Sequence, residues 1–373
     1  MIDPATQSFA RDSLTKRLAA LRESAAYANY EYVRERVLEI KDRDAARAGS
    51  LATPSNYWQE ELGNFEYMLD ASPLVIDRLR QHTLHITGIW SYEYRTHKPD
   101  GPLRRRLEAL MELAGEDLFV PEHHALGGFG FEHEGRLYNH DTLKYYESLA
   151  AMDRGAVLAE FRGTRERRVA WEIGPGWGGF AYQFKTLCPN VTYVLTDLPE
   201  VFLYSGVYLM TVFPEANFRF YGEVDDDELF DGWDELDFVF VPHTRLDLVA
   251  PPRMDIAMNQ VSFQEMTTEQ VRAYVHHAAA RDCPYLYSLN RERSLYNPEL
   301  DGVRSLIAER YWPHEVEVLP DTHAFTLETT SKVSRAQRAA MRAKELRAGE
   351  NTKAKVKESL DYRHIVGWRR RVT

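Results

Sequence analysis

The sequence predicts an α/β fold whose central sheet is mainly parallel. From Arg168 to Leu289, short strand-like apolar runs alternate with helix-like segments, which is typical of parallel strands joined by crossover helices. A glycine-rich turn separates the first of these runs from the helix-like segment that follows it. Hydrophobic residues make up 44% and aromatic residues 12% of the 373 residues, which is enough apolar material for a globular core.

The composition excludes several classes of protein. The formal net charge of −11 argues against a nucleic-acid-binding protein, because polyanion binders need a basic surface. Cys188 and Cys283 are too few for a disulfide framework and lack the spacing of a zinc site, so a reducing cytoplasm is the expected location. The first thirty residues lack a secretory signal, and no apolar run approaches the ~18 residues of a membrane span. We therefore expect neither a nucleic acid nor a membrane as a partner.

The first part of the chain is expected to be mainly helical. Apolar residues recur at intervals of three and four from Gln7 to about Arg47, and helix-like sequence continues to Leu118 with breaks at Pro73 and at 98–102. The glycine-rich stretch L-G-G-F-G-F at 126–131 then predicts a loop or short hairpin. A helix over 143–152 should follow this stretch, with Asp141 as its N-cap.

Six strands and three helices are expected in the alternating part of the chain. The strands are placed at 169–173, 192–196, 217–221, 237–241, 255–259 and 284–289, and the clearest helices at 180–187, 199–212 and 268–281. Two later runs, 315–319 and 325–329, are expected to close the sheet as an antiparallel pair.

The last residues of the chain differ in charge from the rest. Thirteen Lys or Arg and four acidic residues between Lys332 and Thr373 give this segment a charge of +9, which leaves −20 for everything before it. Its Ala, Glu and Lys texture predicts a basic helical tail. We expect the tail to pack against the acidic body or against the second subunit of a homodimer.

The glycine-rich turn is the strongest functional signal. It reads V-A-W-E-I-G-P-G-W-G-G-F-A from Val169 to Ala181, where a strand ends and a helix begins. The turn fits the dinucleotide pattern G-x-G-x-x-G, and it equally fits the methyltransferase pattern E-x-G-x-G-x-G that starts at Glu172. A carboxylate at Glu172 would repel a pyrophosphate but attract the ammonium and sulfonium of S-adenosylmethionine. The sequence therefore favours S-adenosylmethionine, with an NAD(P)-dependent oxidoreductase as the alternative.

The next strand ends in V-L-T-D-L-P, which places Asp197 where a carboxylate can bind ribose hydroxyls. The residues expected to bind the cofactor are Glu172, Gly174, Pro175, Gly176, Gly178, Asp197 and Leu198.

Three motifs together resemble a known family. These are E-I-G-P-G-W-G-G-F-A, the following T-D-L-P-E, and N-Q-V-S-F-Q-E-M after the fifth strand. They resemble the sugar O-methyltransferases, a class I S-adenosylmethionine-dependent group found mostly in bacteria, over roughly Leu126 to Asn290. The resemblance implies a seven-stranded Rossmann-like core, here over 153–331, and methyl transfer to a sugar hydroxyl. Residues 1–152 are less easily matched, and we expect them to shape the acceptor site or form a lid over it.

Methyl transfer to a sugar hydroxyl needs a general base or a metal ion, because the protonated hydroxyl is a weak nucleophile. His243 and Glu265 follow the fourth and fifth strands and are the first candidates for the base. An exposed loop histidine and a helix-capping glutamate are the alternative interpretations of these two residues. His140 and Asp141 form a second catalytic candidate cluster, just before the nucleotide core.

Acceptor binding is expected from residues on both sides of the glycine-rich turn. The candidates are Asn259, Gln264, His123 and Phe129, although the stretch containing Phe129 equally suits a packed hairpin. Magnesium held by oxygen ligands is a further option, but the carboxylates show no firm ligand spacing. A non-catalytic adapter that binds partners through the basic tail is the remaining alternative.

Overall fold

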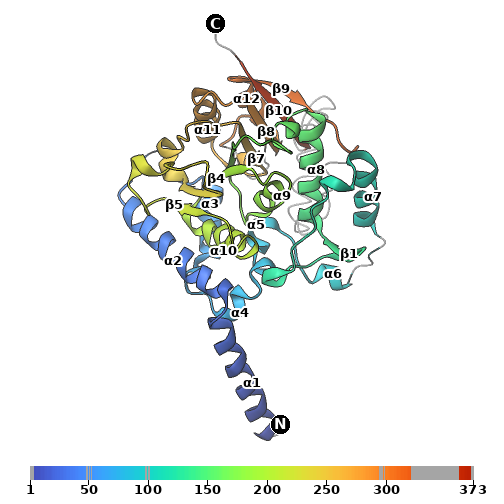
Figure 1. Cartoon of the computed structure of the whole chain (residues 1–373), viewed down its shortest axis with the longest axis vertical. Helices are drawn as coiled ribbons and strands as arrows, with labels where there is room; N and C mark the ends of the chain where they lie inside the picture. Colours follow the sequence, from blue (N-terminus) through green and yellow to red (C-terminus); the bar gives the residue numbers. More distant parts are fainter. Residues whose placement is uncertain are drawn as a thin grey trace, which may run out of the picture.

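The computed structural model describes residues 4–320 and 361–370, apart from 48, 50, 52, 97, 98, 100, 294–296 and 298. An eight-stranded sheet with helices on both faces forms its centre (Figure 1). The strands are β3 (Arg168–Ile173), β4 (Val191–Asp197), β5 (Phe218–Phe220), β6 (Phe238–Pro242), β7 (Ile256–Gln260), β8 (Tyr285–Arg291), β9 (Tyr311–Glu315) and β10 (Tyr362–Arg369). The six expected strands between Arg168 and Arg291 are thus confirmed, with ends shifted by at most two residues.

The strand order β5-β6-β4-β3-β7-β8-β10-β9 defines a doubly wound sheet. The pairs from β5 to β8 are parallel, whereas β10 is antiparallel to both of its neighbours. The chain proceeds from β3 to β4 and on to β5 at the edge of the sheet. Strand β6 then inserts between β4 and β5, and the chain returns to the other side of β3 as β7. Such a reversal opens a crevice at the carboxyl ends of the strands, where ligands bind in this class of fold. The predicted Rossmann-like α/β fold is therefore confirmed, with eight strands in place of seven.

The helices after β3 cover the two faces of the sheet. They are α9 (Gly179–Leu187), α10 (Phe202–Val212), α11 (Thr268–Ala280) and α12 (Val303–Ala308). The expected helices at 180–187, 199–212 and 268–281 correspond to α9, to a 3-10 turn (η7, Pro199–Val201) followed by α10, and to α11. Apolar side chains from alternating strand positions pack under these helices in two buried clusters, one for each face of the sheet.

The region before β3 is mainly helical, as predicted. Its helices are α1 (Pro4–Arg22), α2 (Ala25–Asp44), α3 (Asn56–Glu61), α4 (Pro73–Ile76), α5 (Leu84–Thr87), α6 (Glu93–Thr96), α7 (Pro102–Ala114) and α8 (His140–Arg154). Most of them wrap the body, while α1 extends away from it (Figure 1). A hairpin of β1 (Phe131–His133) and β2 (Arg136–Tyr138) precedes α8.

The expected N-cap of α8 was wrong by two residues. Asn139, not Asp141, caps the helix, because its side chain accepts the Thr142 amide at 2.9 Å while the Thr142 hydroxyl accepts the Asn139 amide. The reciprocal pair is a capping box, which satisfies two otherwise unpaired amides. Helix α11 begins in the same way at Thr267 with Gln270, so Glu265 is not a helix cap.

The expected closing strand pair was also wrong. Strand β9 ends at Glu315, where the first of the two runs was expected to start, and the second run, 325–329, lies outside the described residues. The partner of β9 is instead β10, which inserts between β8 and β9. Residues 362–369 of the expected helical tail are therefore a strand, with His364, Ile365 and Val366 buried. The rest of the tail, on which the adapter alternative depends, falls mostly outside the described residues.

A buried polar cluster holds β10 against α8. His364 Nε2 lies 3.2 Å from Glu147 Oε1, and the opposite ring nitrogen lies 2.8 Å from the Tyr287 hydroxyl. Arg106 pairs with the same glutamate from α7. Although burial opposes ionisation, hydrogen bonding to His364 and the Arg106 charge lower the pKa of Glu147 below its usual value. The last strand is thus tied both to the sheet and to the helix that leads into the core.

The described part of the chain contains no helix that is both long and apolar enough to cross a membrane. Both cysteines are buried and unpaired.

Candidate active site

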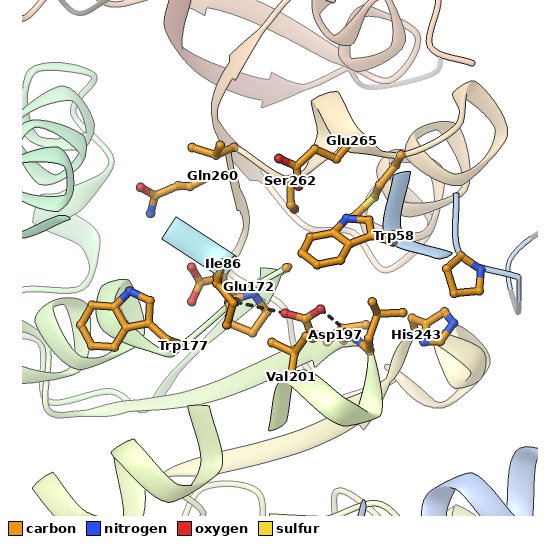
Figure 2. A pocket seen from close by; sticks show the side chains of 18 of the residues that line it. Trp58, Ile86, Glu172, Trp177, Asp197, Val201, His243, Gln260, Ser262 and Glu265 are labelled. Carbon is orange, nitrogen blue, oxygen red and sulfur yellow. Dashed lines mark hydrogen bonds between the residues drawn. The ribbon is translucent and has the colours of Figure 1, made fainter. Parts of the chain in front are cut away.

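A pocket of about 140 Å³ opens at the carboxyl ends of β3, β4, β6 and β7 (Figure 2). It lies at the point where the strand order reverses, which is where ligands bind in this class of fold. The lining residues come from the glycine-rich turn, from the loops after β4, β6 and β7, and from the region before β3. Among the expected site residues, the pocket brings together Glu172, Gly174, Pro175, Gly176, Asp197, Leu198, His243 and Glu265.

The glycine-rich turn needs glycine at Gly174 for both space and conformation. Its φ is +69°, and a Cβ atom there would lie 2.1 Å from the Ser262 hydroxyl oxygen. Gly178 has a φ of +86° and lies against the backbone of Ser205 on α10, outside the pocket lining. Gly178 therefore serves helix packing rather than ligand contact, unlike the expectation for it.

The amide groups of the turn are already used within the protein. The Gly174 amide donates to the Thr196 carbonyl at 2.8 Å, and the Gly178 amide donates to the Pro175 carbonyl at 3.0 Å. The Gly176 amide donates to the Asp197 carboxylate at 3.0 Å. A phosphate held at such a turn depends on these amides as donors. These three glycine amides therefore do not form an anion cradle.

Asp197 ends β4 and also closes the glycine-rich turn. Its second oxygen accepts the Leu198 amide at 2.8 Å. Burial raises the pKa of Asp197 to about 7, although the two backbone hydrogen bonds oppose the rise. Each carboxylate oxygen has a further lone pair, so the group can still accept hydrogen bonds from two adjacent hydroxyls of a ribose.

Glu172 and Glu265 add two further carboxyl groups to the same pocket. Glu172 on β3 is 2% exposed and accepts a hydrogen bond from the Tyr193 hydroxyl at 2.8 Å. Glu265 ends a 3-10 turn after β7 (η10, Phe263–Glu265). Burial is the main cause that raises the pKa of each residue to about 8, and the Asp197 charge adds to both shifts. Three acidic groups that resist ionisation together form a site that a cation would stabilise.

The motif N-Q-V-S-F-Q-E-M builds the turn that carries Glu265. Asn259 donates to the Ile173 carbonyl at 2.8 Å and accepts the Phe263 amide at 2.9 Å. Gln264 accepts the Arg291 amide at 3.0 Å and donates to the Tyr362 hydroxyl at 3.2 Å. Both side chains are buried and outside the pocket lining, so their role is to position the turn. The acceptor contact that was expected of them has no support in the pocket lining.

Val261, in the middle of this motif, has a left-handed backbone with a φ of +67°. A β-branched residue seldom adopts this conformation, and such strain concentrates at functional sites. The strained residue is held by its amide, which donates to the Leu289 carbonyl at 2.7 Å. Its two neighbours, Gln260 and Ser262, both line the pocket.

One wall of the pocket comes from residues before β3 that the sequence did not single out. They are Pro54, Ser55, Trp58, Ile86 and Thr87. The Ser55 hydroxyl donates to the Glu265 carbonyl at 2.6 Å, and the Gln270 amide group donates to the Thr53 carbonyl at 2.8 Å. These two hydrogen bonds hold the segment around Thr53 and Ser55 across the crevice.

His243 and Glu265 lie on different sides of the pocket. His243 begins the 3-10 segment after β6 (η9, His243–Leu248) and lies beyond Asp197, whereas Glu265 follows β7 (Figure 2). Trp58 projects into the space between these two residues (Figure 2). Both candidate bases are therefore in the pocket, but they face different parts of it.

Asp141 belongs to a buried ion-pair network and not to the pocket lining. It accepts hydrogen bonds from Arg80 at 2.8 Å, from the Trp177 indole at 3.1 Å and from Lys144 at 3.1 Å. Arg80 is fully buried and also pairs with Glu122 at 2.7 Å. Although burial opposes ionisation, Lys144 and Arg80 lower the pKa of Asp141 below its usual value. An aspartate held ionised by three donors is a positioning group and a poor general base.

The remaining candidates also lie outside the pocket lining. His140 donates its amide to the Tyr94 hydroxyl at 2.9 Å, and His123 Nδ1 accepts the Ala125 amide at 3.1 Å. Phe129 packs on Tyr94 with 5.3 Å between ring centroids. The nearby Gly130 has no room for a Cβ atom, which would lie 2.3 Å from the Tyr138 carbonyl oxygen. The L-G-G-F-G-F stretch is therefore a packed hairpin, the second of the two interpretations of this stretch.

Among the described residues, no group of three or more His, Cys, Asp or Glu side chains is arranged to hold a metal ion. The acidic run 225–228 forms a short turn in which Asp226 pairs with Arg245 at 2.7 Å. The expected magnesium ion thus has no support in the described part of the chain.

Comparison with known proteins gives limited likeness. No protein-family model matches the chain, and no curated protein matches it. The YcgJ protein of Bacillus subtilis matches with a TM-score of 0.39 and 12% identity, over 61% of this chain and 100% of its own. Phosphoethanolamine N-methyltransferase 2 of Haemonchus contortus, solved with S-adenosyl-L-methionine, matches with a TM-score of 0.36 and 9% identity, over 62% of this chain and 57% of its own.

A cyclopropane-fatty-acyl-phospholipid synthase-like protein of Lactobacillus casei gives a TM-score of 0.34 and 10% identity, over 71% of this chain and 98% of its own. At these scores the likenesses do not decide what the chain does, and its function is inferred from the pocket.

Proposed function

We propose that this chain is an S-adenosylmethionine-dependent methyltransferase that acts in the cytoplasm on a hydroxyl of a sugar, glycoside or oligosaccharide. One observation carries the proposal: Glu172, Asp197 and Glu265 converge on a glycine-rich turn whose Gly174, Gly176 and Gly178 amides already have acceptors. Such a site favours a cationic ligand that has a ribose but no phosphate. S-adenosylmethionine fits that description, because it carries an ammonium and a sulfonium.

The same observation argues against the oxidoreductase alternative. A dinucleotide places its pyrophosphate on the amides of this turn. Here the Gly176 amide donates to Asp197, and Glu172 lies buried behind the turn. The pyrophosphate would therefore lose its donors and meet two carboxyl groups.

The charges of the pocket support one direction for the cofactor, because Glu172 and Glu265 attract its cationic end. With the ribose at Asp197 after β4, the purine extends toward the end of β6, where His243 lies, and the amino-acid end extends toward β3 and β7. Glu172 and Glu265 are then near the charged end of the ligand. The cofactor, when bound, supplies an electrophilic methyl group on its sulfonium.

Glu265 is the general base that this arrangement favours. Its pKa of about 8 makes the ionised carboxylate a stronger base than an ordinary glutamate, and the ionised fraction that accepts the proton of the acceptor hydroxyl grows as the pH approaches 8. His243 is the second candidate and lies on the purine side. Trp58, Tyr145 and Trp177 supply aromatic surface in the pocket wall, which suits stacking against a sugar ring.

Two measurements test the proposal. Calorimetry with the full chain should detect binding of S-adenosylhomocysteine and no binding of NAD; the reverse result would overturn it. Transfer of labelled methyl groups should then be screened across sugars and oligosaccharides, with and without a chelator. Transfer to amines or lipids but to no sugar would retain the methyltransferase and refute the acceptor class.

A further inference from the structure

The pocket contains a pair of hydrogen-bond donors that the function proposed above leaves unassigned. Lys144 and Gln260 both line it, from α8 and from the end of β7. Lys144 keeps 19% of its side chain exposed, while Gln260 is 7% exposed. Gln260 lies on the side of the pocket opposite His243 (Figure 2).

Helix α8 sets the geometry of this pair. Ser148 follows Lys144 by one helical turn, so the two side chains share a face of α8. The Ser148 hydroxyl donates to the Gln260 side-chain oxygen at 2.8 Å. Because the oxygen of the amide is bound in this way, its nitrogen is the end left to face a ligand. Within the described residues, that buried nitrogen has no hydrogen-bond acceptor.

A buried amide nitrogen without an acceptor destabilises the protein, unless a ligand or water supplies one. Gln260 is therefore poised to donate, and Lys144 brings a positive charge to the same region. Lys144 is held in place by Asp141 at 3.1 Å, which is itself anchored by the buried Arg80. An ammonium beside an amide donor is a set that binds a carboxylate.

We propose that Lys144 and Gln260 bind the α-carboxylate of S-adenosylmethionine, an inference that rests on the proposed function. The cofactor's amino-acid end carries one anionic group among its cationic ones. The amides of Gly174, Gly176 and Gly178 do not receive it, because they already donate to Thr196, Asp197 and Pro175. The three carboxyl groups of the pocket would repel it. Lys144 and Gln260 give it two donors, on the side of the pocket toward which the amino-acid end extends.

The electrostatics of the pocket agree with this placement. The charge of Lys144 opposes the rise in pKa of both Glu172 and Glu265, so it lies within electrostatic reach of both groups. The ligand's ammonium then meets Glu172 while its carboxylate meets Lys144, and each charge of the zwitterion has an opposite partner.

The test compares two ligands on three proteins. Calorimetry of the full chain would measure the dissociation constants of S-adenosylhomocysteine and of its decarboxylated analogue, which lacks only the α-carboxylate. The three proteins are the wild type, Lys144→Met and Gln260→Leu. The wild type should prefer the complete ligand by about 30-fold, the value of a charged hydrogen bond. Lys144→Met should abolish most of that preference and Gln260→Leu part of it, with little change for the analogue.

Two further variants keep the result interpretable. Lys144→Arg retains the charge and should keep most of the preference, even where Lys144→Met folds poorly. Lys16→Met is the matched control, because Lys16 is exposed on α1, a helix that contributes no residue to the pocket lining and extends away from the body (Figure 1). Equal binding of the two ligands by the wild type, or an equal loss for both in Lys144→Met, would overturn the inference while the proposed function stands. Failure of the wild type to bind either ligand would instead refute the proposed function.

Discussion

The Asp197 carboxylate accepts the Gly176 amide at 3.0 Å, so the residue expected to hold a ribose also locks the glycine-rich turn. In Asp197→Ala both functions are lost together. We expect S-adenosylhomocysteine to bind at least about tenfold more weakly to this variant, since a hydrogen bond to a charged group contributes about 1.5–3 kcal/mol. Calorimetry measures the change, with Asp234→Ala as the control because Asp234 is exposed on a loop. An unchanged dissociation constant for Asp197→Ala would refute the ribose role.

Cofactor binding should strengthen as the pH rises from about 6 to 8.5. In the free protein, burial raises the pKa of Asp197 to about 7 and the pKa values of Glu172 and Glu265 to about 8. A cationic ligand favours the ionised carboxylates, so its binding releases protons, and affinity grows as the carboxyl groups ionise. Calorimetry of S-adenosylmethionine binding, repeated in buffers of different ionisation enthalpy, gives the number of protons released. Proton uptake, or affinity that falls with pH, would contradict the proposed ligand.

Glu172→Gln should stabilise the unliganded protein while weakening cofactor binding. The pKa of Glu172 is about 8 in the folded protein and near 4.5 when unfolded, so folding favours the protonated form. This group therefore lowers the free energy of unfolding as pH rises from about 4.5 toward 8. Removing it should add about 4 kcal/mol to the free energy of unfolding at pH 8 and little at pH 4.5. Urea unfolding at both pH values checks this, and a variant less stable than wild type at pH 8 would disprove it.

Glu265→Gln should lower methyl transfer by about 100-fold at saturating S-adenosylmethionine, as loss of a general base does. Saturation is needed because the loss of this carboxylate also weakens binding of the cationic cofactor. In the wild type, kcat/KM, which reports the free enzyme, should rise with pH through a value near 8, and the variant should lack the part of this rise that belongs to Glu265. His243→Ala tests the second candidate in the same assay. If both variants turn over at the wild-type rate, neither residue is the base.

Gly174→Ala should lose both stability and cofactor binding. Gly163 offers a matched control, because it has the same φ of +69° but no heavy atom within 4 Å of the place where a Cβ atom would lie, whereas Gly174 faces Ser262. Gly163→Ala should cost about 1–2 kcal/mol, the strain of the left-handed backbone alone. Gly174→Ala should cost about 2 kcal/mol more because of the steric clash. Equal unfolding free energies for the two variants would show that Ser262 yields easily.

Sequence patterns predicted the features that depend on neighbouring residues. The strands, the glycine-rich turn and the two carboxyl groups at Glu172 and Asp197 were found because hydrophobic periodicity and turn chemistry are local. Asp141 was misjudged because a charged residue next to a helix start suits both a cap and a catalytic group. Its partner Arg80 lies sixty-one residues away, and no spacing rule connects the two.

The pocket residues that the sequence did not predict come from segments far from the glycine-rich turn in the chain. Trp58 and Lys144 enter the pocket from segments with no motif of their own, and only the fold brings them to the ends of the strands. Strand β10 was hidden for a related reason. Its charged and aromatic flanks are typical of a surface segment, and its buried centre of Ile365 and Val366 is short. The adjoining β8 and β9 determine that it becomes a strand.

The position of β10 also bears on how the molecule is made. On the ribosome, β8 and β9 emerge long before Tyr362–Arg369, the segment that joins them. Until then the nascent chain holds β8 with one row of backbone groups open, which is the kind of edge that pairs with other chains. His364 is likewise the last partner to reach Glu147. The edge of β8 thus stays open until Tyr362–Arg369 has been made, which is the interval in which a chaperone would protect it.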